Sequence, residues 1–195
     1  MKENFVTRHA KKGRMLESLI TSKTRIKLLL KFFLNSTTTS YLRDLAAEFG
    51  ESTNAIRLEL NHLEDAGLLY SKTEGNKKLF QANRYHPLFS DIHRLLLKHT
   101  GIDHVVENVV TNLGGLHSAY VTGSFARGHD NPVIELLLVG KDIDNEYLAH
   151  LVGKAEKIIK RSIRYNIITS EEIGALRKNN PEVLLLWKQT DIQRQ

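Results

Sequence analysis

Apolar side chains recur every three or four residues along much of the first hundred positions, which is the spacing of amphipathic helices. One such stripe runs from Thr24 to Leu34 and stops at the polar run Asn35 to Thr39. The pattern then predicts a shorter helix, with Ser40 as its N-cap and Gly50 as a left-handed C-cap. Two helices joined by a polar connection are therefore expected between Thr24 and Gly50.

A third helix is predicted directly after Gly50, with Ser52 or Thr53 as its N-cap and Gly67 at its end. Its apolar stripe consists of Ile56, Leu60 and Leu63. A turn of only three or four residues separates it from the preceding helix. Two short helices connected in this way form a helix-turn-helix.

Two short apolar stretches follow the third helix, at Leu68 to Tyr70 and at Leu79 to Gln81. The segment between them, Ser71 to Lys78, is rich in lysine and contains Gly75. This pattern predicts the two strands of a β-hairpin, which directly after a helix-turn-helix is most simply a wing. A disordered loop between two helices is the alternative.

Strands and helices alternate in the second half of the chain. A helix from about Pro87 to Gly101 leads into it, because proline is favoured in the first helical turn. The pattern then predicts a helix at Ile102 to Leu113, strands at Ala119 to Thr122 and Ile134 to Val139, a helix at Asn145 to Ile159 and a strand at Ile163 to Ile168. The tail from Ser170 to Gln195, which contains the apolar run Leu184 to Trp187, is predicted to be helical. Such alternation is typical of a small α/β domain.

These elements predict a fold of two domains, one α+β and one α/β. Residues 1–20 form a basic arm or a first helix, and the pattern leaves both open. Residues 21–100 form the winged helix-turn-helix, and residues 101–195 form the α/β domain with its helical tail.

The composition excludes several classes of protein. The 195 residues include no cysteine, so a disulfide scaffold, thiolate zinc sites and cysteine nucleophiles are excluded. No apolar run approaches the roughly 20 residues that span a bilayer, and the polar start of the chain lacks the core of a signal peptide. We therefore expect a cytoplasmic protein without a membrane partner.

Positive charge is concentrated in the first half of the chain. The net charge is +6, with 17 Lys+Arg against 10 Asp+Glu in residues 1–100 and 11 against 12 in the remainder. A bias of this kind indicates a polyanion as the partner of the N-terminal half. A basic surface that serves only solubility is the alternative.

One face of the third helix carries polar side chains that suit base recognition. At 100° per residue, Asn54, Arg57 and Asn61 lie together, away from the apolar stripe. Arginine can pair with guanine and asparagine with adenine in the major groove, and Ser52 or Thr53 can reach a phosphate. Wing residues Lys72, Asn76, Lys77 and Lys78 would add phosphate contacts. An ordinary solvated helix face is the alternative.

The segment Tyr41 to Tyr70, "YLRDLAAEFGESTNAIRLELNHLEDAGLLY", together with the hairpin after it, resembles the winged-helix domains of ArsR-like bacterial regulators. The resemblance implies a homodimer that binds two half-sites of double-stranded DNA. It also implies dimer contacts through the helices at Thr24 to Leu34 and Pro87 to Thr100. Metal sensing by cysteines, which occurs in part of that family, has no ligands here.

The segment Tyr120 to Gly128 resembles the Gly-Ser turn of minimal nucleotidyltransferases. In those enzymes a following strand holds divalent metals with an Asp-x-Asp pair, and a later strand supplies a third carboxylate. Here Val133 stands in place of the first aspartate and Glu135 in place of the second, while the strand Ile163 to Ile168 contains no acid. We therefore expect a pseudoenzyme with no catalytic residues and no metal.

What remains of that resemblance is the glycine-rich turn. Gly123, Ser124 and Arg127 could bind a nucleotide or another phosphate ligand. The alternative is that the glycines serve a tight turn only, in a domain used for interaction or dimerisation. No cofactor is expected, and the scattered histidines offer no convincing ligand spacing.

The leading functional hypothesis is a sequence-specific transcriptional regulator whose second domain serves assembly or ligand sensing. An active nucleotidyltransferase that uses the winged helix to hold its substrate is one alternative. An antitoxin-like partner protein is another, by analogy with pairs that contain nucleotidyltransferase-like domains.

Overall fold

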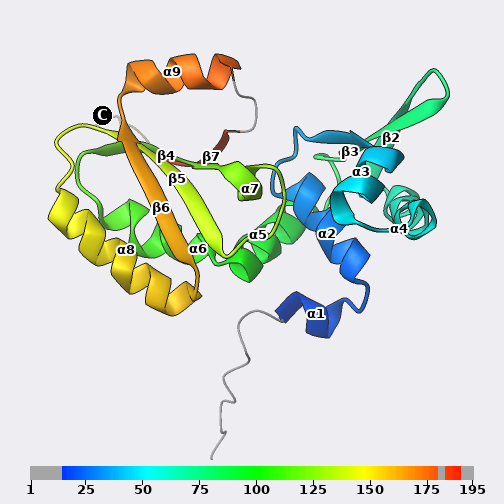
Figure 1. Ribbon diagram of the computed structural model, residues 1–195, viewed down its shortest axis with the longest axis horizontal. Coiled ribbons are helices and arrows are strands. Elements are labelled where there is room, and N and C mark those ends of the chain that lie inside the picture. The colour runs from blue at the N-terminus through cyan, green and yellow to red at the C-terminus, as the bar shows by residue number, and fades with distance from the viewer. Residues whose placement is uncertain (1–14, 180–182, 190–195) are drawn as a thin grey trace, which may run out of the picture.

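The computed structural model describes residues 15–179 and 183–189, a mixed α/β arrangement of helices and two β-sheets (Figure 1). In the first half the elements are α1 (Met15–Leu19), α2 (Lys23–Phe33), β1 (Thr39–Tyr41), α3 (Leu42–Phe49), α4 (Thr53–Asp65), β2 (Leu69–Glu74), β3 (Lys77–Ala82) and α5 (Phe89–Thr100). In the second half they are α6 (Ile102–Asn108), a 3-10 turn (Val110–Asn112), β4 (Leu116–Thr122), α7 (Gly123–Ala126), β5 (Val133–Gly140), α8 (Asn145–Ile159), β6 (Ser162–Ile168), α9 (Ser170–Asn179) and β7 (Leu184–Lys188). Most of the predicted arm lies outside the described residues, and α1 forms its last part.

The first sheet has the order β1-β3-β2 and is antiparallel throughout. Strand β1 was not predicted, and it corrects the assignment of Ser40 as a helix cap. Ser40 is buried and pairs in register with Phe80 of β3, while Tyr41 stands at the N-cap of α3 without a side-chain hydrogen bond. Ser40 therefore belongs to the sheet and not to the helix. Its pairing with β3 is a long-range contact, which the local sequence does not encode.

The connection between α3 and α4 agrees with the prediction. Gly50 adopts the left-handed conformation that ends α3, with φ of 65°. The hydroxyl of Ser52 accepts a hydrogen bond of 3.1 Å from the backbone N–H of Ala55 and so caps α4. Three residues, 50–52, therefore join the two helices and fix the start of each.

The β2–β3 hairpin is longer than predicted because its loop contains only Gly75 and Asn76. Glu74 and Lys77 are the last paired residues on either side of this loop. Gly75 has φ of 62°, as the first central position of a type II′ turn requires. Most of the segment expected to be loop is therefore strand that projects from the sheet (Figure 1).

The second sheet has the order β6-β5-β4-β7, in which only β5 and β6 are parallel. Helices α5, α6 and α8 lie against one face, and α9 lies on the other (Figure 1). Under α9, Ile173 is buried with Tyr120 and Val139. The predicted helix at Asn145 to Ile159 is confirmed, with the Asp144 carboxylate capping its first turn.

The prediction of a helical tail was wrong for the run Leu184 to Trp187. These residues form β7, which pairs antiparallel with β4, so that Leu184 lies opposite Val121 and Trp187 opposite Ala119. A run of consecutive apolar residues is compatible with a helix and also with an edge strand of a sheet that is covered on both faces. Here the pairing with β4 makes the run a strand. Only α9 of the tail is helical within the described residues; residues 180–182 and 190–195 lie outside them.

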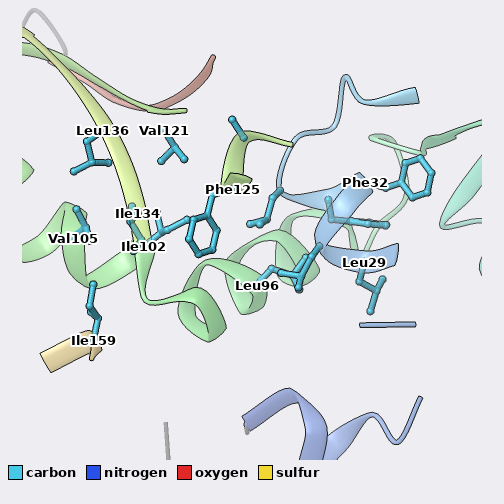
Figure 2. Packing of buried hydrophobic residues seen from close by; sticks show 14 of the residues in the cluster. Leu29, Phe32, Leu96, Ile102, Val105, Val121, Phe125, Ile134, Leu136 and Ile159 are labelled. Carbon is cyan, nitrogen blue, oxygen red and sulfur yellow. The ribbon is translucent and has the colours of Figure 1, made fainter. Parts of the chain in front are cut away.

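One continuous cluster of buried side chains runs through both halves (Figure 2). Leu29 and Phe32 of α2 and Leu96 of α5 contribute to it from one side. Phe125 of α7 and Ile134 of β5 contribute from the other. The domain boundary near residue 101 stays a prediction, and the core extends across it. Among the described helices, none is long and apolar enough to cross a membrane.

Two buried polar atoms, Nδ1 of His99 and Oδ1 of Asp103, have no hydrogen-bond partner among the described residues. Burial lowers the pKa of His99, while the nearby Asp130 carboxylate raises it and Arg161 lowers it further. Because the pKa is depressed in the folded state, the unfolded chain takes up this proton first as the pH falls.

Stability is therefore expected to decrease as the pH falls below the ordinary histidine pKa of about 6.5. Urea unfolding at a series of pH values should show a smaller decrease in His99→Gln than in the parent. An identical pH profile in the variant would contradict this assignment.

Candidate functional site

The outward face of α4 presents the polar side chains that the sequence singled out. Asn54, Arg57 and Asn61 are exposed, while Ile56, Leu60 and Leu63 are buried. Nη1 of Arg57 donates a 2.9 Å hydrogen bond to Oδ1 of Asn54, which holds the guanidinium along the helix surface. The predicted division of α4 into an inner and an outer face is therefore confirmed.

Sequence reasoning missed Leu58, which lies on this outward face and is 57% exposed. Its position follows from the same 100° spacing, since Leu58 stands four residues from Asn54 and three from Asn61. An exposed leucine gives the face one apolar element among its hydrogen-bonding groups.

At the start of α4, both residues predicted to contact phosphates, Ser52 and Thr53, are exposed. The Ser52 hydroxyl also accepts a hydrogen bond from the backbone of its own helix. A hydroxyl that accepts one hydrogen bond can still donate another, so capping leaves Ser52 able to contact a phosphate.

The hairpin lysines are exposed, and each has a partner within the chain. Lys72 lies 3.6 Å from the Glu74 carboxylate, and Lys78 lies 3.2 Å from that of Glu64. The ammonium of Lys77 lies 5.5 Å from the centre of the Tyr41 ring. Asn76 is exposed in the turn. Exposed pairs of this kind are weak, so a phosphate could compete for these lysines.

Charge around α4 is less positive than the half-chain bias predicts. Residues 40–82 hold five Lys+Arg and seven Asp+Glu, whereas residues 1–39 hold nine and two. The acids of α3, α4 and their connection bind cations of α2, as in the 2.7 Å pair of Arg25 with Glu59 and the 2.6 Å pair of Lys27 with Glu51. Part of the predicted basic surface is therefore neutralised by internal ion pairs.

The two helices predicted to mediate dimerisation are used mainly within the chain. Residues 28–34, in α2 and at its C-cap, are all buried. The exposed positions of α5 are polar, and they are Ser90, Asp91, Arg94 and Lys98. The homodimer stays a prediction, and neither helix offers it a broad apolar face.

The Gly-Ser turn after β4 lies directly against a carboxylate. Gly123 has φ of 63°, and a Cβ placed on it would lie 2.4 Å from Oε2 of Glu135. Antiparallel pairing of β4 and β5 places Thr122 opposite Glu135, which brings this side chain over the turn. Gly123 is thus required for the close approach of Glu135, so the space above the turn already holds a negative charge.

The other residues of the predicted phosphate site are dispersed around this turn. The Ser124 hydroxyl accepts a 3.2 Å hydrogen bond from Nδ2 of Asn131, and Arg127 is exposed. Val133 lies at the start of β5 and adds no ligand atom in its side chain. Across the described ranges, no group of three histidine, aspartate or glutamate side chains could hold a metal ion.

Beside the turn, a depression of about 550 Å³ lies on the second sheet. It is lined by Thr122, Glu135, Leu136, Ile163, Arg164, Tyr165 and Asn166. Register places Arg164 of β6 next to Glu135 of β5, so two opposite charges lie side by side on the sheet. The sequence signal for Arg164 and Asn166 is their alternation with Ile163 and Tyr165, which places the two polar side chains on one face of the strand.

No protein-family model matches the chain, and no curated protein matches it. Among solved structures, the chain is similar to a protein from Sulfolobus solfataricus that is described provisionally as a nucleotidyltransferase. The identity is 22% over 46% of this chain and 78% of that chain, with a TM-score of 0.32. It is also similar to a hypothetical protein from Pyrobaculum spherical virus, at 18% identity over 75% of each chain and a TM-score of 0.27. At these scores neither likeness establishes a shared fold.

Proposed function

We propose that the protein is a sequence-specific DNA-binding regulator in which α3, α4 and the β2–β3 hairpin act as a winged helix-turn-helix. In this proposal α4 enters the major groove and the hairpin lies along the phosphate backbone. The observation that carries it is the outward face of α4. This face combines Asn54, Arg57, Leu58 and Asn61 beside an extended hairpin that carries three lysines.

The chemistry of this face matches the edges of bases in the major groove. Arg57 can form two hydrogen bonds with guanine, and Asn54 or Asn61 can form two with adenine. Lys72, Lys77 and Lys78 would supply contacts with phosphates that do not depend on the base sequence. Residues 40–82 hold more acidic than basic side chains. Hydrogen bonds with bases should therefore contribute more to the affinity for DNA than overall charge does.

Selection from a randomised pool of duplex DNA tests the proposal. We expect one enriched motif, and we expect it to be pseudo-palindromic if two copies bind two half-sites. Arg57→Ala should cost about 1–3 kcal/mol and relax the motif at one position, whereas Lys77→Ala should weaken all sites alike. Absence of any enriched motif with the parent protein would refute the proposal.

Leu58 gives this proposal a second, independent test. The 5-methyl group of thymine is the apolar feature of the major groove, and it is the group that an exposed leucine can contact. Replacing one thymine of the selected motif by deoxyuridine should weaken binding, and Leu58→Ala should remove that difference. Filter-binding titrations with the paired duplexes measure it. Equal affinity for every deoxyuridine-substituted duplex would show that Leu58 makes no such contact.

We infer that the second sheet assists assembly or ligand sensing and does not catalyse nucleotidyl transfer. Two-metal transfer requires carboxylates from adjacent strands, and Val133 and Arg164 stand where acids would be needed beside Glu135. Incubation with labelled nucleoside triphosphates and magnesium or manganese should leave protein and nucleic-acid acceptors unlabelled. A transferred label that disappears in Glu135→Gln would overturn this inference.

A further inference from the structure

Four polar side chains converge on the depression in the second sheet. Thr122 of β4, Glu135 of β5 and the pair Arg164 and Asn166 of β6 all line it. Strand alternation places them on the face that also carries α9. Within residues 15–179 and 183–189, none of the four side chains makes a hydrogen bond or an ion pair.

Other charged side chains close to the start of β6 have partners within the chain. Arg161 donates to the Asp130 carboxylate over 2.7 Å, and Glu156 accepts from the backbone N–H of Ile163 over 2.6 Å. Glu135 and Arg164 are register partners with opposite charges, yet they form no ion pair. The depression thus offers one anionic, one cationic and two neutral polar groups to a ligand.

This set of groups disfavours two obvious classes of ligand. A divalent cation would need several oxygen ligands, and the depression has a single carboxylate with a guanidinium beside it. A phosphate dianion would gain from Arg164 but would be repelled by Glu135, whose carboxylate covers Gly123. A ligand that satisfies both charges must itself carry both.

We propose that the depression binds a small zwitterion of the α-amino acid kind. Its ammonium group would pair with Glu135 and its carboxylate with Arg164, while Thr122 and Asn166 would donate or accept further hydrogen bonds. A volume of about 550 Å³ lies within the range of small-molecule sites. The proposal does not depend on DNA binding.

Thermal unfolding of the full chain with each common α-amino acid tests the proposal. At least one amino acid should raise the unfolding midpoint in a concentration-dependent way, because a ligand that binds only the folded state stabilises it. The corresponding amine, which lacks the carboxylate, should bind at least about tenfold more weakly than the amino acid. The corresponding acid, which lacks the ammonium group, should lose affinity to the same extent. Equal binding of either analogue would overturn the proposal, as would the absence of any response.

Calorimetric titration of variants with the amino acid that responds locates the site. Glu135→Gln and Arg164→Gln should each weaken binding by about tenfold or more. Lys154→Gln removes an exposed charge on α8, on the other face of the sheet, and should leave the affinity unchanged. Undiminished binding to both Glu135→Gln and Arg164→Gln would overturn the proposal. DNA binding is measured separately, so failure of the regulator hypothesis would leave these results intact.

Discussion

Gly128→Ala is expected to destabilise the protein by about 3 kcal/mol, through both backbone strain and a steric clash. Gly128 has φ of 80°, in the left-handed region that side chains rarely adopt. A Cβ at this position would lie 2.2 Å from the Cα of Lys31 and 2.8 Å from its carbonyl oxygen. Because both atoms belong to the backbone of α2, no side-chain rotation can relieve the contact.

Gly153→Ala is the matched control for this substitution. Gly153 lies within α8, and a Cβ there would meet no atom within 4 Å. Alanine at an exposed or open helical position should stabilise by about 0.5–1 kcal/mol. Denaturant unfolding of both variants compares them with the parent. A Gly128→Ala protein as stable as the parent would show that α2 and the loop can separate without cost.

The close approach at Gly128 is one of several contacts between the two halves of the chain. Nδ2 of Asn35, a buried side chain after α2, donates a 3.1 Å hydrogen bond to the carbonyl of Ala126. The ring of His129 contacts the carboxylate of Glu48 in α3. These contacts begin at Ala126, the last residue of α7 in the Gly-Ser turn.

Local sequence signals were sufficient for the elements that carry their own caps and periodicity. Helix α8 has both of the bounds that its long apolar stripe predicted, and the structure adds Asp144 as its cap. Gly50 and Ser52 likewise marked the junction of α3 and α4. In contrast, β1 and β7 are short strands that exist through pairing with β3 and β4. Such long-range pairing leaves no periodic signal in a few residues.

The two candidate sites differ in the same respect, since local sequence predicts one of them and not the other. The outward face of α4 followed from helical spacing, because an isolated helix already separates its inner and outer sides. The contact of Glu135 with Gly123 and the neighbouring position of Arg164 depend on strand register. A register shift by one residue would move each side chain to the other face of the sheet. Sequence alone could not fix that choice.

Helix α4 is also expected to depend strongly on Arg25, through a carboxylate that sequence reasoning did not place in the interior. Glu59 lies on the inner side of α4 and is only 8% exposed. Nε of Arg25 donates to its carboxylate over 2.7 Å, and Nη2 of Arg25 lies 3.3 Å from Nδ1 of His62. This ion pair therefore joins α2 to the middle of α4.

The pKa of Glu59 depends on both its burial and its hydrogen bonds. Burial alone would raise this pKa, but hydrogen bonds from Ser22 and Arg25 outweigh burial and hold it below the ordinary glutamate value. Because the pKa is depressed in the folded state, the pair stabilises the protein above the ordinary glutamate pKa. That stabilisation is lost as the pH falls through the lower, folded value.

Arg25→Leu should destabilise the protein by about 2 kcal/mol at neutral pH, since it leaves the Glu59 carboxylate buried without its partner. The figure is below that for fully buried pairs because the Arg25 side chain is 37% exposed. The double variant Arg25→Leu with Glu59→Leu should recover most of the loss, because two apolar side chains can pack where an ion pair was. Urea unfolding of the parent, both single variants and the double variant gives the coupling energy. At acid pH the Arg25→Leu defect should shrink as Glu59 is protonated, and a defect that is independent of pH would assign the loss to packing instead of charge.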